Sequence, residues 1–157
     1  MMYVVAAILV LGYFFGNPDW LLSASLAKNM FCHHFFHANV FHLAANLFAG
    51  YYVLRKATIG RLACAYLIAS LSVLCAVHPV IGFSNMVYAL IGLRSPHFKH
   101  PWWRHPATAV FLSVTLIMLF VPNISAVTHV VSFCGGVLVS MISRKVQQVK
   151  NDSARYI

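Results

Sequence analysis

The chain alternates between long apolar runs and short polar interruptions, and this pattern predicts six helices. The interruptions contain prolines, glycines or groups of basic residues, which end helices. Several runs are shorter than the roughly 20 residues of a typical membrane span, so their helices must be tilted or enclosed by neighbours. The shortest run is the best candidate for a helix surrounded by protein. The predicted helices cover residues 1–15, 39–54, 62–77, 81–93, 107–121 and 124–142.

The composition places these helices in a membrane. Of the 157 residues, 61% are hydrophobic and only 8% are charged, whereas soluble domains average about 25% charged residues. Too little polar surface remains to face water, which excludes a soluble domain, a disordered chain and a disulfide scaffold. We expect an all-α membrane protein, a compact bundle of six transmembrane helices over residues 1–143, followed by a basic cytoplasmic tail over residues 144–157.

The positions of Lys and Arg predict the orientation of the bundle. If the six runs alternate in direction, every Lys and Arg except Lys28 falls on the same side. Cytoplasmic loops carry the excess of basic residues, so both termini are expected in the cytoplasm. The small size of the core favours a multi-pass protein of a bacterial inner membrane.

Acidic side chains are almost absent, and this limits the chemistry. The chain has no Glu, and its two carboxylates, Asp19 and Asp152, lie outside the apolar runs. An aspartate-dyad protease, an H-E-x-x-H metalloprotease and a carboxylate proton relay are therefore excluded. A general base inside the membrane has to be histidine.

Polar residues inside apolar runs are candidates for function. His42 and Asn46 are four residues apart and share one face of the second predicted helix. Both can donate hydrogen bonds into the bundle, either as packing contacts between helices or to a ligand. A metal site built from His33, His37 and His42 is a further alternative, although the chain offers no carboxylate to support such ligands.

A second group follows the proline-containing break before the fourth run. If the helix begins there, Ser84 lies in its first turn, near unpaired backbone N–H groups that stabilise an oxyanion. Tyr88 falls one turn later on the same face, and Gly92 permits close helix approach. The alternative is that Ser84 only caps the helix.

A third group lies early in the sixth run. His129 precedes Ser132 by three residues, and Ser132 with Gly136 forms a stripe of small residues suited to close packing. A histidine such as His129, taken alone, is more often a hydrogen-bonded interface residue than a base. Because the even-numbered runs start at the same depth, however, Ser84 and His129 are expected to meet near the outer surface as a Ser–His dyad.

Together these residues resemble the motifs of the rhomboid intramembrane serine proteases. The resemblance extends over the whole six-helix core in order and spacing. It rests on three separate motifs: His37-x4-His42-x3-Asn46, Gly82-x-Ser84 followed by Tyr88-Ala89-Leu90-x-Gly92, and His129 with Gly136.

The resemblance implies that Ser84 is the nucleophile and His129 the general base. His42, Asn46 and the backbone N–H of Ser84 would form the oxyanion hole. Tyr88 would pack against the His129 ring.

The resemblance also implies that His37 helps to order the outer loop. Two positions depart from the family pattern, since Asn85 and Ser132 stand where the family usually has glycine. Asn85 follows the serine, and its side chain is expected either to narrow the site or to donate another hydrogen bond.

The expected activity is hydrolysis of a peptide bond in or near the outer end of a substrate transmembrane helix. The expected partners are a single-pass transmembrane protein and the lipid bilayer, with no nucleic acid, and no cofactor or metal is expected. One alternative is a non-catalytic rhomboid-like protein that binds transmembrane helices, which Asn85 favours. The other is a histidine-based metal or haem protein of the membrane.

Overall fold

The computed structural model describes residues 2–17, 19, 25–55, 57–76, 78–95, 106–118 and 125–154. Within these ranges the chain is helical and contains no strand. The α-helices are α1 (Met2–Phe15), α3 (Leu26–Cys32), α4 (Val40–Leu54), α5 (Ile59–Ser72), α6 (Ser84–Arg94), α7 (Pro106–Met118) and α8 (Ala126–Ser153), with short 3-10 helices η1 (His33–Phe35) and η2 (Val73–Cys75).

The six predicted apolar helices correspond to α1, α4, α5 with η2, α6, α7 and α8. α5 begins three residues before its apolar run because the Thr58 side chain accepts a hydrogen bond from the Arg61 N–H and caps the helix. α6 begins at Ser84, three residues later than predicted, after Gly82 takes a φ of 114°. By length and composition, only α8 is long and apolar enough to cross a membrane alone, among the residues described.

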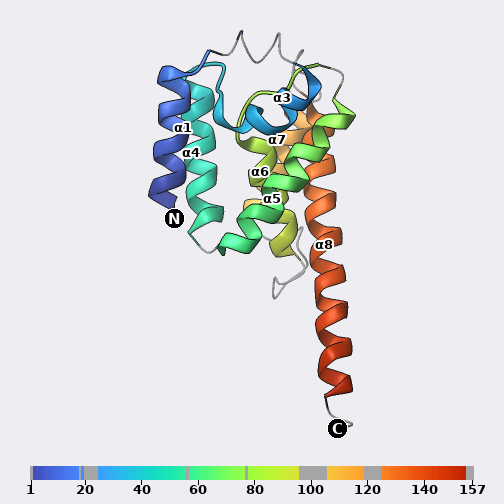
Figure 1. The fold of residues 1–157 in the computed structure, drawn as a ribbon. Coiled ribbons are helices and arrows are strands. Elements are labelled where there is room, and N and C mark those ends of the chain that lie inside the picture. The colour runs from blue at the N-terminus through green and yellow to red at the C-terminus, as the bar shows by residue number, and fades with distance from the viewer. Residues whose placement is uncertain are drawn as a thin grey trace.

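α6 lies at the centre of the bundle (Figure 1). Every residue of the stretch 85–93 is buried, so this helix has no face directed at lipid or solvent. The prediction that the fourth run is surrounded by protein is therefore confirmed. α6 packs most extensively against α8, and next against α5.

Two glycines bring α6 and α8 into close contact. A Cβ added to Gly92 would lie 2.2 Å from the carbonyl oxygen of Phe133, and one added to Gly136 would lie 2.3 Å from that of Ala89. Both distances are far below van der Waals contact, so only glycine fits at either position. This close packing sets the separation between residues carried at the starts of the two helices.

The segment between α1 and α4 contains structure that the apolar pattern does not predict. α3 and η1 lie at one end of the bundle, opposite the end where α1 begins and α8 ends (Figure 1). Asn29 of α3 donates from Nδ2 to the Val80 carbonyl and accepts from the Val80 N–H, at 3.0 and 3.2 Å. These two bonds fix the segment that leads into α6.

α8 continues beyond the apolar run that predicts it. The run ends at residue 142, whereas the helix ends at Ser153, and residues 141–150 are all exposed. The helix projects past the rest of the bundle (Figure 1). The predicted boundary between core and tail at residues 143 and 144 thus falls inside one continuous helix.

Candidate active site

Ser84 is the first residue of α6, and its position follows from the turn before it. Gly82 adopts a positive φ of 114°, a conformation open to glycine and rarely to other residues. The helix then begins with no side-chain cap at Phe83. The first N–H groups of a helix have no intrahelical acceptor, so the backbone around Ser84 presents donors beside its hydroxyl.

The structure brings Ser84 and His129 together. Nε2 of His129 lies 2.8 Å from Ser84 Oγ, and Nδ1 of the same ring lies 2.8 Å from the carbonyl oxygen of Ser125. A carbonyl can only accept, so Nδ1 carries the proton and Nε2 is left as the acceptor for the Ser84 hydroxyl. This is the tautomer that a general base requires. The acceptor that orients the ring is a backbone group, which the sequence does not reveal.

The ring of Tyr88 packs against the imidazole of His129. Its ring meets that of His129 edge to face, with centroids 4.8 Å apart and an angle of 70° between the planes. The Tyr88 hydroxyl accepts a hydrogen bond from Thr115 of α7, which anchors the ring. The packing of Tyr88 on His129 that the sequence motif implies is present, and Thr115 is an addition that the motif did not contain.

His42 and Asn46 lie against the turn before Ser84. A Cβ added to Gly82 would lie 2.7 Å from His42 Nε2 and 3.3 Å from Asn46 Nδ2. Asn46 is buried, and its Nδ2 has no hydrogen-bond partner among the described residues. An unsatisfied buried donor costs about 1–3 kcal/mol, and this one lies beside the turn that leads to Ser84.

His37 is buried next to His42. Its side chain is 1% exposed, and the two rings meet edge to face with centroids 5.2 Å apart. Burial, with a smaller contribution from His42, lowers the pKa of His37 to about 4. Neither ring nitrogen of His37 has a partner within the described part of the chain. His37 is therefore neutral, and it lies in the chain between η1 and the start of α4.

The Asn85 side chain points into the helix bundle and not into the space beside Ser84, where it was expected. Its side chain is fully buried, with Oδ1 accepting from Thr128 Oγ1 at 3.3 Å and Nδ2 lying 3.5 Å from Ser72 Oγ. The amide therefore links α6 to α8 and to the end of α5. A neighbour of Ser84 in a helix projects about 100° away from it, which explains why Asn85 bonds to the bundle.

α3 and η1 contribute contacts that sequence reasoning missed. The His33 carbonyl accepts the Gly82 N–H at 2.8 Å, and the His33 Nδ1 bonds to the Asn29 carbonyl at 2.9 Å. His34 Nε2 lies 3.1 Å from Ser70 Oγ of α5. Together with the Asn29 clamp on Val80, these bonds hold the turn before α6. The only sequence signal for them was a group of polar residues outside the apolar runs.

In the described part of the chain, His33, His37 and His42 are not grouped as the ligands of one metal ion. Among the described residues, no three His, Cys, Asp or Glu side chains are grouped so that they could hold one ion. The rings of His33 and His34 lie with centroids 3.7 Å apart and planes tilted by 43°, and Nδ1 of His33 is already bonded to backbone. The geometry thus gives no support to the alternative of a site built from His33, His37 and His42.

The helical bundle, with a serine and a histidine in contact between two closely packed helices, defines a membrane protein of the rhomboid type. The sequence matches the Rhomboid domain over residues 27–146, and the chain belongs to this family. It is accordingly an integral membrane protein. The family acts on transmembrane substrates and includes serine proteases as well as members without activity. No curated protein matches the sequence.

Proposed function

We propose that this chain is an intramembrane serine endopeptidase with a Ser–His dyad. The observation that carries the proposal is the 2.8 Å contact between Ser84 Oγ and His129 Nε2, with the second ring nitrogen bonded to the Ser125 carbonyl. A nucleophile, a base and a group that orients the base are the components of hydroxyl activation.

The proposed topology has six spans, with both termini in the cytoplasm of a bacterium and the dyad toward the outer face of the inner membrane. Two observations support it. All Lys and Arg except Lys28 lie on one side of this arrangement. α1 begins and α8 ends at one end of the bundle, while α3 lies at the other (Figure 1). The shorter helices then cross in contact with neighbours and not alone.

In the first half of the reaction, Ser84 Oγ attacks the scissile carbonyl carbon while His129 Nε2 takes the hydroxyl proton. The tetrahedral oxyanion is stabilised by Asn46, His42 and the backbone N–H of Ser84. The C–N bond then breaks, and the imidazolium gives its proton to the departing amine. The product of this half is an acyl-enzyme and one free peptide.

In the second half, water replaces the amine. His129 removes a proton from water, the hydroxide attacks the ester, and Ser84 recovers its proton. Water must reach a site below the membrane surface. Buried ring nitrogens of His33 and His37 lack partners among the described residues, and such atoms are sites for bound water.

The proposed substrate is a single-pass transmembrane protein in the same bilayer. A helix hides each amide behind intrahelical hydrogen bonds, so the segment must unwind before Ser84 can reach a carbonyl. Glycine and proline lower the cost of this unwinding. We therefore expect cleavage at small or helix-breaking residues near the outer end of the substrate helix.

The proposal is tested with a serine-reactive fluorophosphonate probe on the detergent-purified chain. Wild type is expected to label, while Ser84→Ala and His129→Ala are not. Ser132→Ala is the control, since Ser132 lies on the same helix as His129 and is fully buried, whereas Ser84 is half-buried. That variant should label like wild type.

A folded wild-type protein that does not label would favour the non-catalytic alternative and overturn the proposal. Cleavage of a transmembrane substrate that persists in Ser84→Ala would exclude the mechanism. Asn46→Ala should reduce kcat by about 10²–10³ without abolishing labelling, as for the loss of one oxyanion donor.

A further inference from the structure

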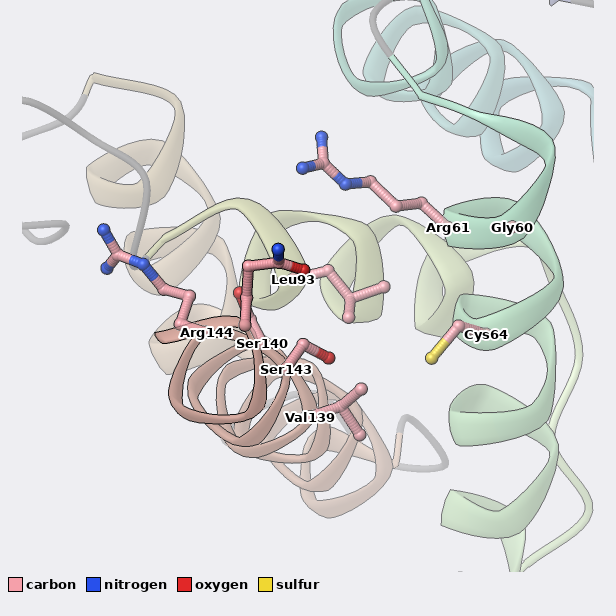
Figure 2. A pocket seen from close by; sticks show the side chains of 9 residues that line it. Gly60, Arg61, Cys64, Leu93, Val139, Ser140, Ser143 and Arg144 are labelled. Atoms are coloured by element: carbon pink, nitrogen blue, oxygen red, sulfur yellow. The ribbon is translucent and has the colours of Figure 1, made fainter. Parts of the chain in front are cut away.

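The contacts that hold the dyad lie along the first turns of α6. The far end of this helix, where Leu93 lines an open hollow with Cys64 and Val139 (Figure 2), is about 14 Å along the axis from Ser84. A side chain there is too distant to touch the base. Tyr88 lies only about one turn from Ser84, so the neighbours of Tyr88 are close enough to act on the dyad.

One of these neighbours comes from α7, a helix that carries none of the three sequence motifs. Among the α7 residues whose side chains the structure describes, only Thr115 is buried, with 5% of its surface exposed. The residues before and after it, Val114 and Leu116, are exposed. Thr and Ser that are buried in membrane helices bond across to neighbouring helices, so Thr115 marks the face of α7 that meets the bundle.

Thr115 is linked to the base through Tyr88. The Thr115 hydroxyl donates to the hydroxyl of Tyr88 on α6, and the Tyr88 ring packs on His129 of α8. Nε2 of His129 lies 2.8 Å from Ser84 Oγ. Side chains from α7, α6 and α8 therefore form one series of contacts that ends at the Ser84 hydroxyl.

The two hydrogen bonds of the His129 imidazole leave one rotation of the ring to be fixed by packing. Nδ1 is bonded to the Ser125 carbonyl and Nε2 to Ser84 Oγ, each at 2.8 Å. These bonds hold the two nitrogens, but the ring can still tilt about the line that joins them. The edge-to-face contact with Tyr88, with 70° between the planes, opposes this tilt. The Tyr88 ring opposes it more firmly when its hydroxyl end is held as well.

We propose that Thr115 is a positioning residue for the general base. Its hydrogen bond holds the hydroxyl end of Tyr88, and the held ring keeps Nε2 of His129 directed at Ser84 Oγ. The inference rests on the proposed function, since it concerns the activation of Ser84. Hydrogen bonds weaken steeply as their angle departs from linear, so a loosened Tyr88 ring should slow proton transfer from Ser84.

The rate constant of fluorophosphonate labelling, measured on the full chain in detergent, tests the proposal without a known substrate. Thr115→Val keeps the branched shape and removes the hydroxyl. It should lower the rate constant about three- to tenfold, the effect of losing one hydrogen bond. Thr115→Ser keeps the donor and should react nearly as fast as wild type. Ser113→Ala is the control, because it removes a hydroxyl from an exposed position on the same helix, and it should label like wild type.

A purely structural role of Thr115 predicts a different result for Thr115→Val. The fraction of molecules that label at saturation would fall, while every folded molecule would still react at the wild-type rate constant. That result would overturn the proposal, as would a Thr115→Ser protein that reacts as slowly as Thr115→Val. An equal slowing in Ser113→Ala would contradict it as well, since the loss of any hydroxyl from α7 would then explain the effect.

Tyr88→Phe tests whether Thr115 acts through Tyr88. This variant keeps an aromatic ring against His129 and removes the hydroxyl to which Thr115 donates, so it should slow labelling at least as much as Thr115→Val. Adding Thr115→Val to it should then have little further effect, because coupled residues are not additive. If the two losses multiply in the double variant, Thr115 acts by another route and the proposal is wrong.

The same measurement separates this inference from the proposed function. A folded wild type that does not label overturns the proposed function together with this inference. A wild type that labels, beside a Thr115→Val protein with an unchanged rate constant, overturns this inference alone.

Discussion

Replacing Gly82 with alanine tests the oxyanion arrangement with a single methyl group. The φ of 114° at this residue costs a non-glycine side chain of order 1–3 kcal/mol. The new Cβ would also lie 2.6 Å from His42 Cε1 and 3.3 Å from Asn46 Nδ2. The His42 ring must therefore move, and we expect the free energy of unfolding to fall by about 1–3 kcal/mol.

The effect on cleavage should exceed the effect on stability. Displacing His42 and crowding Asn46 disturbs both side-chain donors of the proposed oxyanion hole. The loss of one such donor lowers kcat by about 10²–10³. We expect Gly82→Ala to lower kcat at least that far in a proteoliposome assay with a fluorogenic transmembrane substrate.

A double-mutant cycle separates this explanation from general damage. If Gly82→Ala acts by displacing the donors, adding Asn46→Ala should cost much less than it does alone, because coupled residues are not additive. Full additivity of the two losses, or a Gly82→Ala protein that cleaves at the wild-type rate, would refute the reasoning. Thermal unfolding in the same detergent identifies any contribution from unfolded protein.

Four further predictions concern packing and pH. Gly136→Ala places a Cβ 2.3 Å from a backbone oxygen of α6, so it should lower the free energy of unfolding by about 1–3 kcal/mol. Gly60→Ala, whose Cβ meets nothing within 4 Å, should raise it by about 0.5–1 kcal/mol. Asn85→Gly should destabilise the protein without raising kcat, and faster cleavage would contradict the placing of its amide between helices. Burial lowers the pKa of both His33 and His37 to about 4; unfolding frees them to bind protons, so the unfolding midpoint should fall as pH drops from about 6.5 toward 4.

Most of the bundle could be predicted because apolar runs and their interruptions are local signals. The predicted helices agree with the observed ones apart from their ends, which depend on single residues such as Thr58 and Gly82. α3 could not be predicted in the same way. It is held by Asn29, whose partner Val80 is 51 positions away, and no periodicity within the segment encodes such a contact.

In the candidate site, too, some features could be predicted from the sequence and others depend on the fold. Spacing and family resemblance were sufficient to select Ser84 and His129, which the structure places in contact. The direction of the Asn85 amide depends on Thr128 and Ser72, which carry no motif. The acceptor for His129 was beyond sequence reasoning altogether, since every residue has a backbone carbonyl and only the fold selects one.

That carbonyl has a consequence for how the site tolerates mutation. The group that orients the imidazole belongs to the main chain at Ser125, so substitution of the Ser125 side chain leaves it in place. It carries no charge and does not ionise, so it adds no titration of its own to the acid limb of the rate profile. The orientation of the His129 ring therefore depends on the backbone geometry at the start of α8. A substitution at position 125 that keeps this geometry removes no group that the ring needs.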